Sequence, residues 1–218
     1  MVDTNTKRIH LLATLKDSDF EDTPQSTTPK EKSVSVRAII IDHEGNVCIQ
    51  TFSNIGFSKL PGGRVEKDEE CLEALKREIL EETGVSVKFK KFSNTETPFF
   101  GKTREIRNSQ GLDQTTYFAV AKKKKRQTSP SPTKSEIEKG HAIQWLPYSQ
   151  AIKLLEAYEP DQLNRHFVRK RELIALKAAR ELIKREADLK AQKAQDKAKK
   201  KTEKAAKIRR RLDGICKP

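Results

Sequence analysis

The sequence predicts an α/β fold in which helices cover both faces of a mixed sheet, an α/β/α sandwich, followed by a long basic C-terminal helix. Three observations predict it. Strand-like segments outnumber helix-like ones between residues 34 and 158, their connections are long and irregular, and no Pro or Gly occurs between Gln162 and Asp213. We therefore expect a flexible N-terminal segment (1–33), an α/β domain (34–158) and a basic helical extension (159–218).

The first half of the expected domain reads as a hairpin, a helix and a strand. The segments "VSVRAIIID" and "VCIQTF" are rich in β-branched residues and flank "HEGN", where Gly45 provides the turn. Residues 69–83 carry apolar side chains at helical spacing, and Gly84 ends that helix. The next segment, "VSVKFKKF", alternates as a strand does.

The second half is expected to begin with a polar loop, roughly residues 93–113, that leads into the strand "TTYFAVAKK". A turn-rich stretch then precedes the strand "HAIQWL" and a helix from about Ser149 to Tyr158. In the N-terminal segment, "IHLLATL" is a short apolar stretch that could dock on the domain as an extra strand or helix.

The C-terminal extension carries most of the positive charge. Residues 161–218 hold 20 Lys or Arg against 8 Asp or Glu, which gives +12 of the chain's net +14. The first half of this helix is expected to pack on the domain through Leu163, Phe167, Ile174, Ala178 and Leu182. The second half has little to bury. It could neutralise the phosphates of a nucleic acid, bind an acidic partner or membrane surface, or be a solvated helix.

The composition excludes several classes of protein. Three cysteines without a C-x-x-C pair argue against a disulfide framework or a zinc site. No run of 18 apolar residues exists, so we expect no transmembrane segment, and the N-terminus lacks the apolar core of a secretion signal. A soluble cytoplasmic protein is the expectation.

The helix expected at 69–83 carries a cluster of carboxylates. Glu78, Glu81 and Glu82 are three and four residues apart, so they share one face and repel one another. Clustered hard oxygen ligands suit Mg²⁺ or Mn²⁺, which would also cancel the repulsion. Arg77 can hold a neighbouring carboxylate, and the Gly62-Gly63 pair permits a tight turn that brings a main-chain carbonyl to the same ion.

These residues resemble the Nudix box: Gly, five residues, Glu, seven residues, Arg-Glu, an apolar residue, any residue, Glu-Glu, any residue, Gly and an apolar residue. The chain matches it at every position, with Gly63, Glu69, Arg77, Glu78, Ile79, Glu81, Glu82, Gly84 and Val85. The resemblance covers about residues 34–158. It implies the Nudix-type α/β/α sandwich and hydrolysis of a diphosphate linked to another group, usually a nucleoside.

The resemblance also implies roles for single residues. Glu78 and Glu82 correspond to the principal metal ligands, Glu81 to a further ligand or the catalytic base, and the Gly62 carbonyl to the backbone ligand ahead of the box. Arg77 and Glu69 correspond to residues that orient the loop and the carboxylates.

In this family the base is a box glutamate or one from a later loop. Here the later-loop candidate is Glu138, with Glu136 as the runner-up. Phe57, Lys59 and Arg64, close to "KLPGG", are the candidates for contacts with substrate.

The function expected from this sequence is metal-dependent hydrolysis of a pyrophosphate bond in a nucleoside triphosphate or another nucleoside diphosphate derivative. The basic tail keeps two alternatives open: an enzyme that acts on 5′ ends of RNA, and a nucleotide-sensing module that binds nucleic acid. The complete box counts against the sensing module, because a pure binder does not need every metal ligand.

Overall fold

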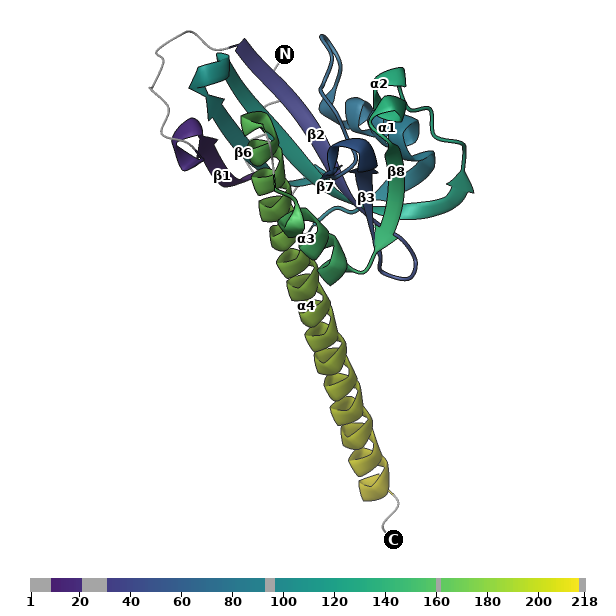
Figure 1. Ribbon diagram of the computed structural model, residues 1–218. Coiled ribbons are helices and arrows are strands. Elements are labelled where there is room, and N and C mark those ends of the chain that lie inside the picture. Colours follow the sequence, from purple (N-terminus) through teal and green to yellow (C-terminus); the bar gives the residue numbers. More distant parts are fainter. Residues whose placement is uncertain (1–8, 21–30, 93–96, 160–161, 216–218) are drawn as a thin grey trace. The chain divides into compact units, whose positions relative to one another are not determined.

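The computed structural model describes residues 9–20, 31–92, 97–159 and 162–215 (Figure 1). They form two compact units, Met1–Ala179 and Arg180–Pro218. In chain order the helices and strands are β1 (His10–Lys16), β2 (Glu31–Ile41), β3 (Val47–Phe52), β4 (Phe57–Lys59), α1 (Cys71–Thr83), β5 (Val85–Phe89), β6 (Phe99–Arg107), β7 (Leu112–Gln127), α2 (Lys134–Glu138), β8 (His141–Leu146), α3 (Tyr148–Ala157) and α4 (Leu163–Ile215).

The first unit is built on one mixed sheet. Its described strands follow the order β1-β6-β7-β2-β3-β4, while β5 also pairs with β7 and β8 with β3. β2 runs parallel to β7 from the Glu31–Leu112 pair to the Ile41–Lys122 pair, and β1 runs parallel to β6. The remaining pairs are antiparallel. The mixed sheet expected from the sequence is confirmed.

The hairpin expected around Gly45 joins β2 to β3. The Asp42 carboxylate accepts hydrogen bonds from the backbone N–H groups of Glu44 and Asn46, at 2.9 and 2.8 Å. Gly45 has a φ of +89°, in the region that glycine adopts without steric cost. The turn therefore folds through its own side-chain contacts.

Helices pack on both faces of the sheet. On one face, buried Ala74, Leu75 and Ile79 of α1 cluster with alternate residues of β2, including Val36 and Ala38. The intervening residues of β2 point to the other face, where Arg37 contacts Glu172 in the first part of α4. α3 lies beside this part of α4, because the Tyr148 hydroxyl donates to the Leu176 carbonyl at 2.9 Å (Figure 1).

Part of the N-terminal segment belongs to the sheet. "IHLLATL" docks as the strand β1, one of the two forms open to it. Phe20 beyond it packs against Phe167 of α4 with the rings tilted and their centroids 4.6 Å apart. β2 begins at Glu31, three residues ahead of the expected domain start. The rest of the expected flexible segment, 1–8 and 21–30, lies outside the described residues.

The polar loop expected at 93–113 was wrong over most of its length. Residues 99–107 form strand β6, and β7 begins at Leu112. The side of β6 that faces the interior carries Thr103, Glu105 and Arg107, all buried. A strand is normally recognised in a sequence by alternating apolar residues. In β6 charged residues occupy the buried positions, so the sequence pattern did not indicate a strand.

The face that α4 buries is rotated from the expected one. Phe167 is fully buried as expected, but Leu163, Ile174, Ala178 and Leu182 are only partly buried. The fully buried positions are Phe167, Arg171, Glu172, Ala175, Leu176 and Ala179. Two of them are charged, so an analysis that follows apolar residues alone misses the centre of this face.

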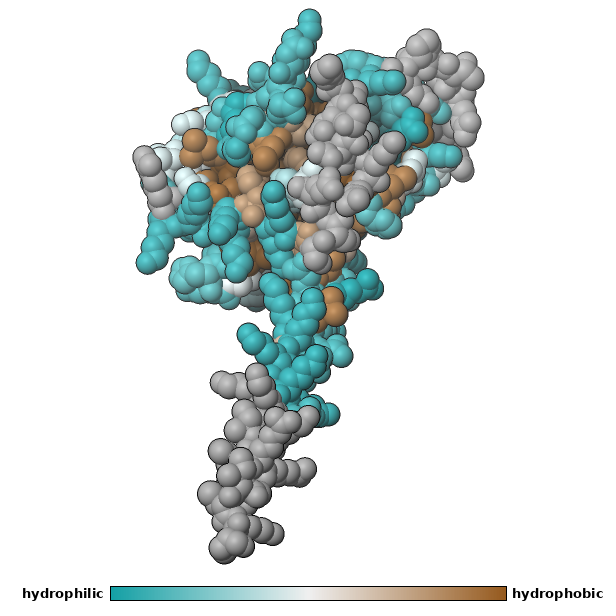
Figure 2. Space-filling model, turned by 180° about the vertical axis from the view of Figure 1, so that it is seen from behind, coloured by the Kyte–Doolittle hydropathy of each residue, from teal (hydrophilic) through white to brown (hydrophobic). Residues whose placement is uncertain are grey.

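The second unit, Arg180–Pro218, consists in its described part of the continuing helix α4. Every residue from Ala187 to Lys200 is exposed, and hydrophilic side chains dominate the described part of the helix in Figure 2. Among the described residues, no helix is both long enough and apolar enough to cross a membrane.

Candidate functional site: an acidic helix beside a basic pocket

The first turns of the site come from the chain that leads into α1. At Gly62 the backbone has a φ of +130°, and a Cβ there would lie 2.1 Å from the Val36 carbonyl oxygen. At Gly63 a Cβ would lie 2.1 Å from Glu78 Oε1. Glycine is required at Gly62, because the backbone there has positive φ and approaches a carbonyl, whereas a side chain at Gly63 would displace the Glu78 carboxylate.

Glu82 is the most firmly held of the box carboxylates. Its side chain is buried and accepts hydrogen bonds from Gly62 N–H at 2.7 Å, Gln50 Nε2 at 2.5 Å and Lys59 Nζ at 3.0 Å. These donors come from the turn before α1, from β3 and from β4. Three separate parts of the sheet thus fix one carboxylate in place.

Glu78 lies one turn earlier on the same side of α1. Burial and the neighbouring charge of Glu82 raise its pKa above the ordinary value, against the opposing effect of Arg77. Glu81 lies further out, with half of its side chain exposed. The three glutamates are therefore not equivalent: two are turned toward the sheet and one toward solvent.

Arg77 ties the acidic cluster together. Its guanidinium makes a bidentate pair with Glu69, at 2.9 and 3.0 Å, and also reaches Glu78 at 3.0 Å and Glu81 at 3.3 Å. The hydrogen bond to Glu69 is the main cause that raises the pKa of Arg77 and lowers that of Glu69 to about 2. Arg77 thus holds the loop 64–70 against the helix, as the sequence indicated.

The oxygen atoms near the start and on one side of α1 are of the chemical type that binds a hard divalent cation. Glu78 and Glu82 supply oxygen atoms, and a cation between them would relieve the repulsion that raises the pKa of Glu78. The carbonyls of Pro61 and Gly63 accept hydrogen bonds from β2, whereas no hydrogen bond to the Gly62 carbonyl occurs among the described residues. The carboxylates now pair with Arg77 and Lys59, and no three acidic, His or Cys groups of the described chain gather in metal-binding geometry.

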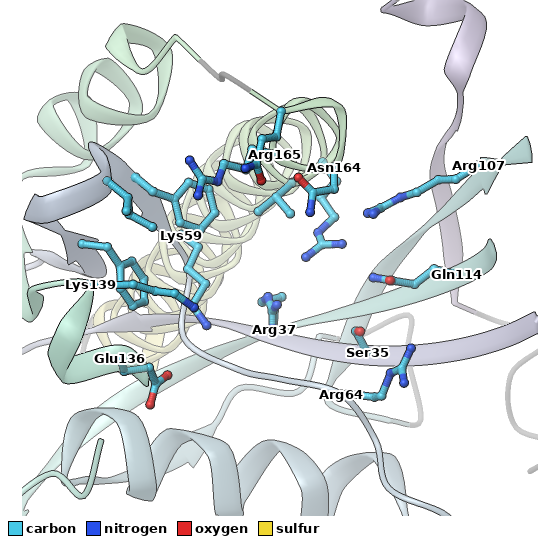
Figure 3. A pocket seen from close by; sticks show the side chains of 16 residues that line it. Ser35, Arg37, Lys59, Arg64, Arg107, Gln114, Glu136, Lys139, Asn164 and Arg165 are labelled. Atoms are coloured by element: carbon cyan, nitrogen blue, oxygen red, sulfur yellow. The ribbon is translucent and has the colours of Figure 1, made fainter. Parts of the chain in front are cut away.

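A pocket of about 480 Å³ lies on the face of the sheet opposite α1. Figure 3 shows Arg37 at its centre, with Lys59, Lys139 and Glu136 to one side and Arg107, Gln114 and Arg64 to the other. Gln162, Asn164, Arg165, Val168 and Arg171 form a wall of this pocket. Seven of the lining residues are cationic and one, Glu136, is acidic, so the pocket suits an anion.

The structure brings the three expected substrate contacts together at this pocket. Phe57, Lys59 and Arg64 all line it. Lys59 also joins the pocket to the acidic helix through its ion pair with Glu82. Phe57 stacks on Phe52, with ring centroids 5.8 Å apart.

Of the two later-loop glutamates, Glu136 lines the pocket and Glu138 does not. Glu138 is exposed at the end of α2, where its backbone carbonyl accepts a hydrogen bond from Asn54 Nδ2. Burial would raise the pKa of Glu136, but hydrogen bonds from Thr133 and the charges of Lys59 and His141 outweigh it and lower that pKa. Of the two candidates from the sequence, only the runner-up, Glu136, faces the pocket.

The sequence reasoning missed a buried charge network contributed by α4. The fully buried Glu172 carboxylate accepts hydrogen bonds from the Leu60 N–H at 3.1 Å, Arg37 Nε at 3.2 Å and Arg171 Nε at 3.4 Å. Arg171 continues to Glu105 on β6 at 2.7 Å. Leu60 stands just before the turn at Gly62, so α4 helps to fix the chain that leads into the box.

A signal for this network was present. Arg171 lies four residues from Phe167 and four from Ala175, on the stripe that packs against the sheet. A charged residue on such a stripe must be paired when it is buried.

The pKa of Arg37 reflects this network. Burial is the largest influence and lowers this pKa, and the nearby Arg171 acts in the same direction, while Glu172 and the box carboxylates oppose both effects.

Fold and site define a class of α/β protein in which an acidic helix, preceded by two glycines, is linked through Lys59 to a cationic pocket on the other side of the sheet. A sequence model of the NUDIX domain matches residues 31–170, well over half of the chain, and the chain belongs to the Nudix family.

Individual relatives are more distant. Nudix hydrolase 2 of Arabidopsis thaliana is 30% identical over 127 residues, which cover 55% of this chain and 40% of the relative. A MutT-like protein of Streptomyces ambofaciens is 28% identical over 101 residues, 44% of this chain and 66% of that protein. The matches thus span less than two thirds of either relative. Among solved structures, the MutT protein from Methanosarcina mazei Go1 is 20% identical with a TM-score of 0.44, over 65% of this chain and 93% of that one.

Proposed function

We propose that this protein is a metal-dependent hydrolase that cleaves a pyrophosphate bond in a nucleoside triphosphate or another nucleoside diphosphate derivative. One observation carries the proposal: Lys59 links the buried box carboxylate Glu82 to a pocket lined by seven cationic side chains. Because Lys59 contacts Glu82 and also lines the pocket, an anionic substrate held there would approach the carboxylates of α1 on the side where Lys59 lies. This juxtaposition is what hydrolysis of a phosphoanhydride requires.

The box residues and the pocket residues have different proposed roles. Glu78, Glu82 and the Gly62 carbonyl would hold Mg²⁺ or Mn²⁺, with Glu81 as a further ligand. When bound, the cation would neutralise the charge on the diphosphate oxygens. Arg77 and Glu69 orient these carboxylates through their ion pairs.

The pocket residues bind and position the substrate. Lys59 and Arg64 offer positive charge to phosphate oxygens, while Phe57 offers an apolar surface. A carboxylate within reach of the attacking water accepts its proton as the water oxygen bonds to phosphorus and the bond to the leaving phosphate breaks. We assign this step to Glu136 of α2, because it lines the pocket, and keep Glu81 or Glu78 as the candidates within the box.

An assay that separates and quantifies the phosphorylated products by anion-exchange chromatography tests the proposal. Purified protein is incubated with nucleoside triphosphates, nucleoside diphosphate sugars and dinucleotides, with MgCl₂, with MnCl₂ or with a chelator. We expect turnover of at least one substrate that depends on the metal and vanishes in the chelator. Absence of metal-dependent turnover across the panel would contradict the proposal.

A second candidate is hydrolysis at the 5′ end of RNA. The observation in its favour is the charge of residues 161–218, +12 within a chain of net +14. Triphosphorylated and capped RNA therefore belong in the same panel, assayed with the full chain and with a chain that ends at Leu189. A rate on RNA that depends on the tail, and no turnover of free nucleotides, would favour this candidate.

A further inference from the structure

The second unit carries lysines at a strict helical spacing. Lys190, Lys193, Lys197 and Lys200 follow one another in steps of three and four residues, so they lie along one face of α4. All four are exposed. We refer to these four residues as the lysine stripe. The sequence continues the same steps with Lys204, Lys207 and Arg211.

The lysine stripe is unfavourable for the helix by itself. Like charges three and four residues apart repel one another and weaken a helix. Between Lys190 and Lys200 the sequence has one acidic residue, Asp196, against five lysines. A bound polyanion would remove this repulsion, so the arrangement is suited to a charged partner.

The dimensions of the stripe fit a linear polyanion. With a rise of 1.5 Å per residue, successive stripe lysines are about 5 Å apart along the helix axis, and the four span about 15 Å. If the helix register continues to residue 211, the seven positions span about 32 Å. A nucleic-acid duplex presents a phosphate charge about every 1.7 Å of its axis, so such a row can meet several phosphates at once.

The composition of this unit argues against two other modes of binding. Residues 180–218 contain no Phe, Trp or Tyr. A helix that lies in a membrane interface uses large apolar and aromatic side chains on its other face, and here the face opposite the stripe carries polar residues such as Gln192, Gln195 and Lys199. Without aromatic rings the unit also cannot stack on bases, so it would contact phosphates without reading sequence.

We propose that the lysine stripe docks on the phosphate backbone of a nucleic acid without sequence preference. This interaction uses none of the box or pocket residues, so it stands independently of the proposed hydrolysis. Docking removes the repulsion within the stripe, and the helical content of the protein should therefore rise when the nucleic acid binds.

Two full-length variants of equal charge test the proposal. In the stripe variant, Lys190, Lys193, Lys197 and Lys200 are replaced by Gln. In the control variant, Gln replaces four exposed cationic residues on other faces of the same helix, Arg180, Lys184, Arg185 and Lys199. Both variants lose four positive charges from the same unit, and only the stripe variant loses them from one continuous face.

Binding is measured by fluorescence anisotropy with a labelled 20-base RNA and a 20-base-pair DNA duplex of mixed sequence, from 50 to 300 mM KCl. Four phosphate contacts account for a slope of log K against log salt of about 2.8 on single strands and about 3.6 on duplex. We expect the stripe variant to lose most of this slope and the control variant less than about one unit of it. Vesicles containing phosphatidylserine serve as the alternative polyanion.

The result expected is at least a tenfold greater loss of affinity in the stripe variant than in the control, with nucleotide hydrolysis unchanged in both. Equal losses in the two variants would show that net charge alone acts, and would overturn the proposal. So would the absence of salt-dependent binding by the unaltered protein, or stripe-dependent binding to the vesicles in preference to both oligonucleotides.

Discussion

At the scale of single residues, the carboxylates of α1 differ in how much freedom they have. Glu82 is buried and held by donors from three parts of the sheet, whereas half of the Glu81 side chain is exposed. A carboxylate held this firmly loses little conformational entropy during a reaction. Electrostatic catalysis depends on such preorganisation. Glu82 is therefore the residue whose replacement should affect catalysis most directly.

Glu82→Gln should lower kcat at least about a hundredfold and leave the fold intact. The amide keeps the size of the side chain, but it removes one negative charge from the expected metal site, so the developing phosphate charge is less well stabilised in the transition state. The measurements are kcat at saturating Mg²⁺ and a thermal unfolding curve. Full turnover by a normally folded variant would contradict the assignment.

Glu136→Gln and Glu138→Gln form a matched pair on one short helix. Only Glu136 lines the pocket, so we expect Glu136→Gln to lower kcat tenfold or more with little change in KM, and Glu138→Gln to retain the wild-type rate.

The pH profile gives a second measurement. The pKa of Glu136 is lowered, so this group stays ionised through neutral pH, and its loss as a base should appear only on the acid side of its ordinary value. Wild-type rates in both variants would return the role of the base to α1.

At the scale of elements, α4 closes the first unit through charges. Burial alone would raise the pKa of Glu105, but Arg171 and Arg107 outweigh burial and lower it. A carboxyl whose pKa is lowered on folding contributes stability above its unfolded value, and that contribution disappears as the pH falls through the folded value.

Glu105→Gln should therefore destabilise the protein by about 3 kcal/mol or more at pH 7, because it removes the negative charge that two buried guanidinium groups share. The difference from wild type should begin to shrink once the pH falls below the ordinary pKa of a glutamate, because the unfolded wild-type chain then takes up a proton that the folded Glu105 carboxyl, with its lowered pKa, does not. Urea unfolding at pH 7 and at pH 3.5 measures both. A difference that does not change with pH would show that packing, rather than charge, holds this contact.

The same network explains how far the sequence could be interpreted. The hairpin at Gly45, the helix that ends at Gly84 and the whole box follow local rules of spacing and turn chemistry, and those elements were confirmed. β6 and the buried face of α4 were not predicted, because Glu105 and Arg171 satisfy each other across 66 residues of chain. From the sequence alone, Glu105 and Arg171 are each expected to be solvent-exposed charges, because the partner of each is distant in the chain.

The site divides in the same way. Glu78 and Glu82 could be found from their spacing on one helix, whereas the choice between Glu136 and Glu138 depends on where α2 lies beside the pocket. The two glutamates are only two residues apart, so the sequence does not indicate which of them lines the pocket.

At the scale of the whole molecule, the two units should differ in what they contribute to stability. Deleting residues 190–218 removes 12 Lys or Arg and 3 Asp or Glu, a net charge of +9. Residues 190–200 are exposed and bury no side chain, so the melting temperature should change by no more than about 2 °C. Hydrolysis of a free nucleotide should also be unchanged, since all box and pocket residues remain.

Deleting residues 163–218 provides the contrast. That longer deletion removes Phe167, Arg171 and Glu172 from the interior, leaves Arg37 without Glu172 and Glu105 without Arg171, and should prevent stable folding. Thermal unfolding of the two truncated proteins compares them directly. A fall in melting temperature of more than 5 °C in the shorter deletion would contradict the view that the second unit is energetically separate.

The hydrogen bond from Leu60 N–H to Glu172 has a consequence for the order of events during translation. The two residues are 112 positions apart, so at about 5 to 20 residues per second the ribosome adds Glu172 about 6 to 22 s after Leu60. Throughout that interval the nascent chain already contains Gly62 and Gly63, but it lacks the Glu172 carboxylate that fixes the turn from the opposite side of the sheet. The active conformation is thus a late product of synthesis, and messages that stop short of codon 172 should yield polypeptides that carry the full box yet remain inert.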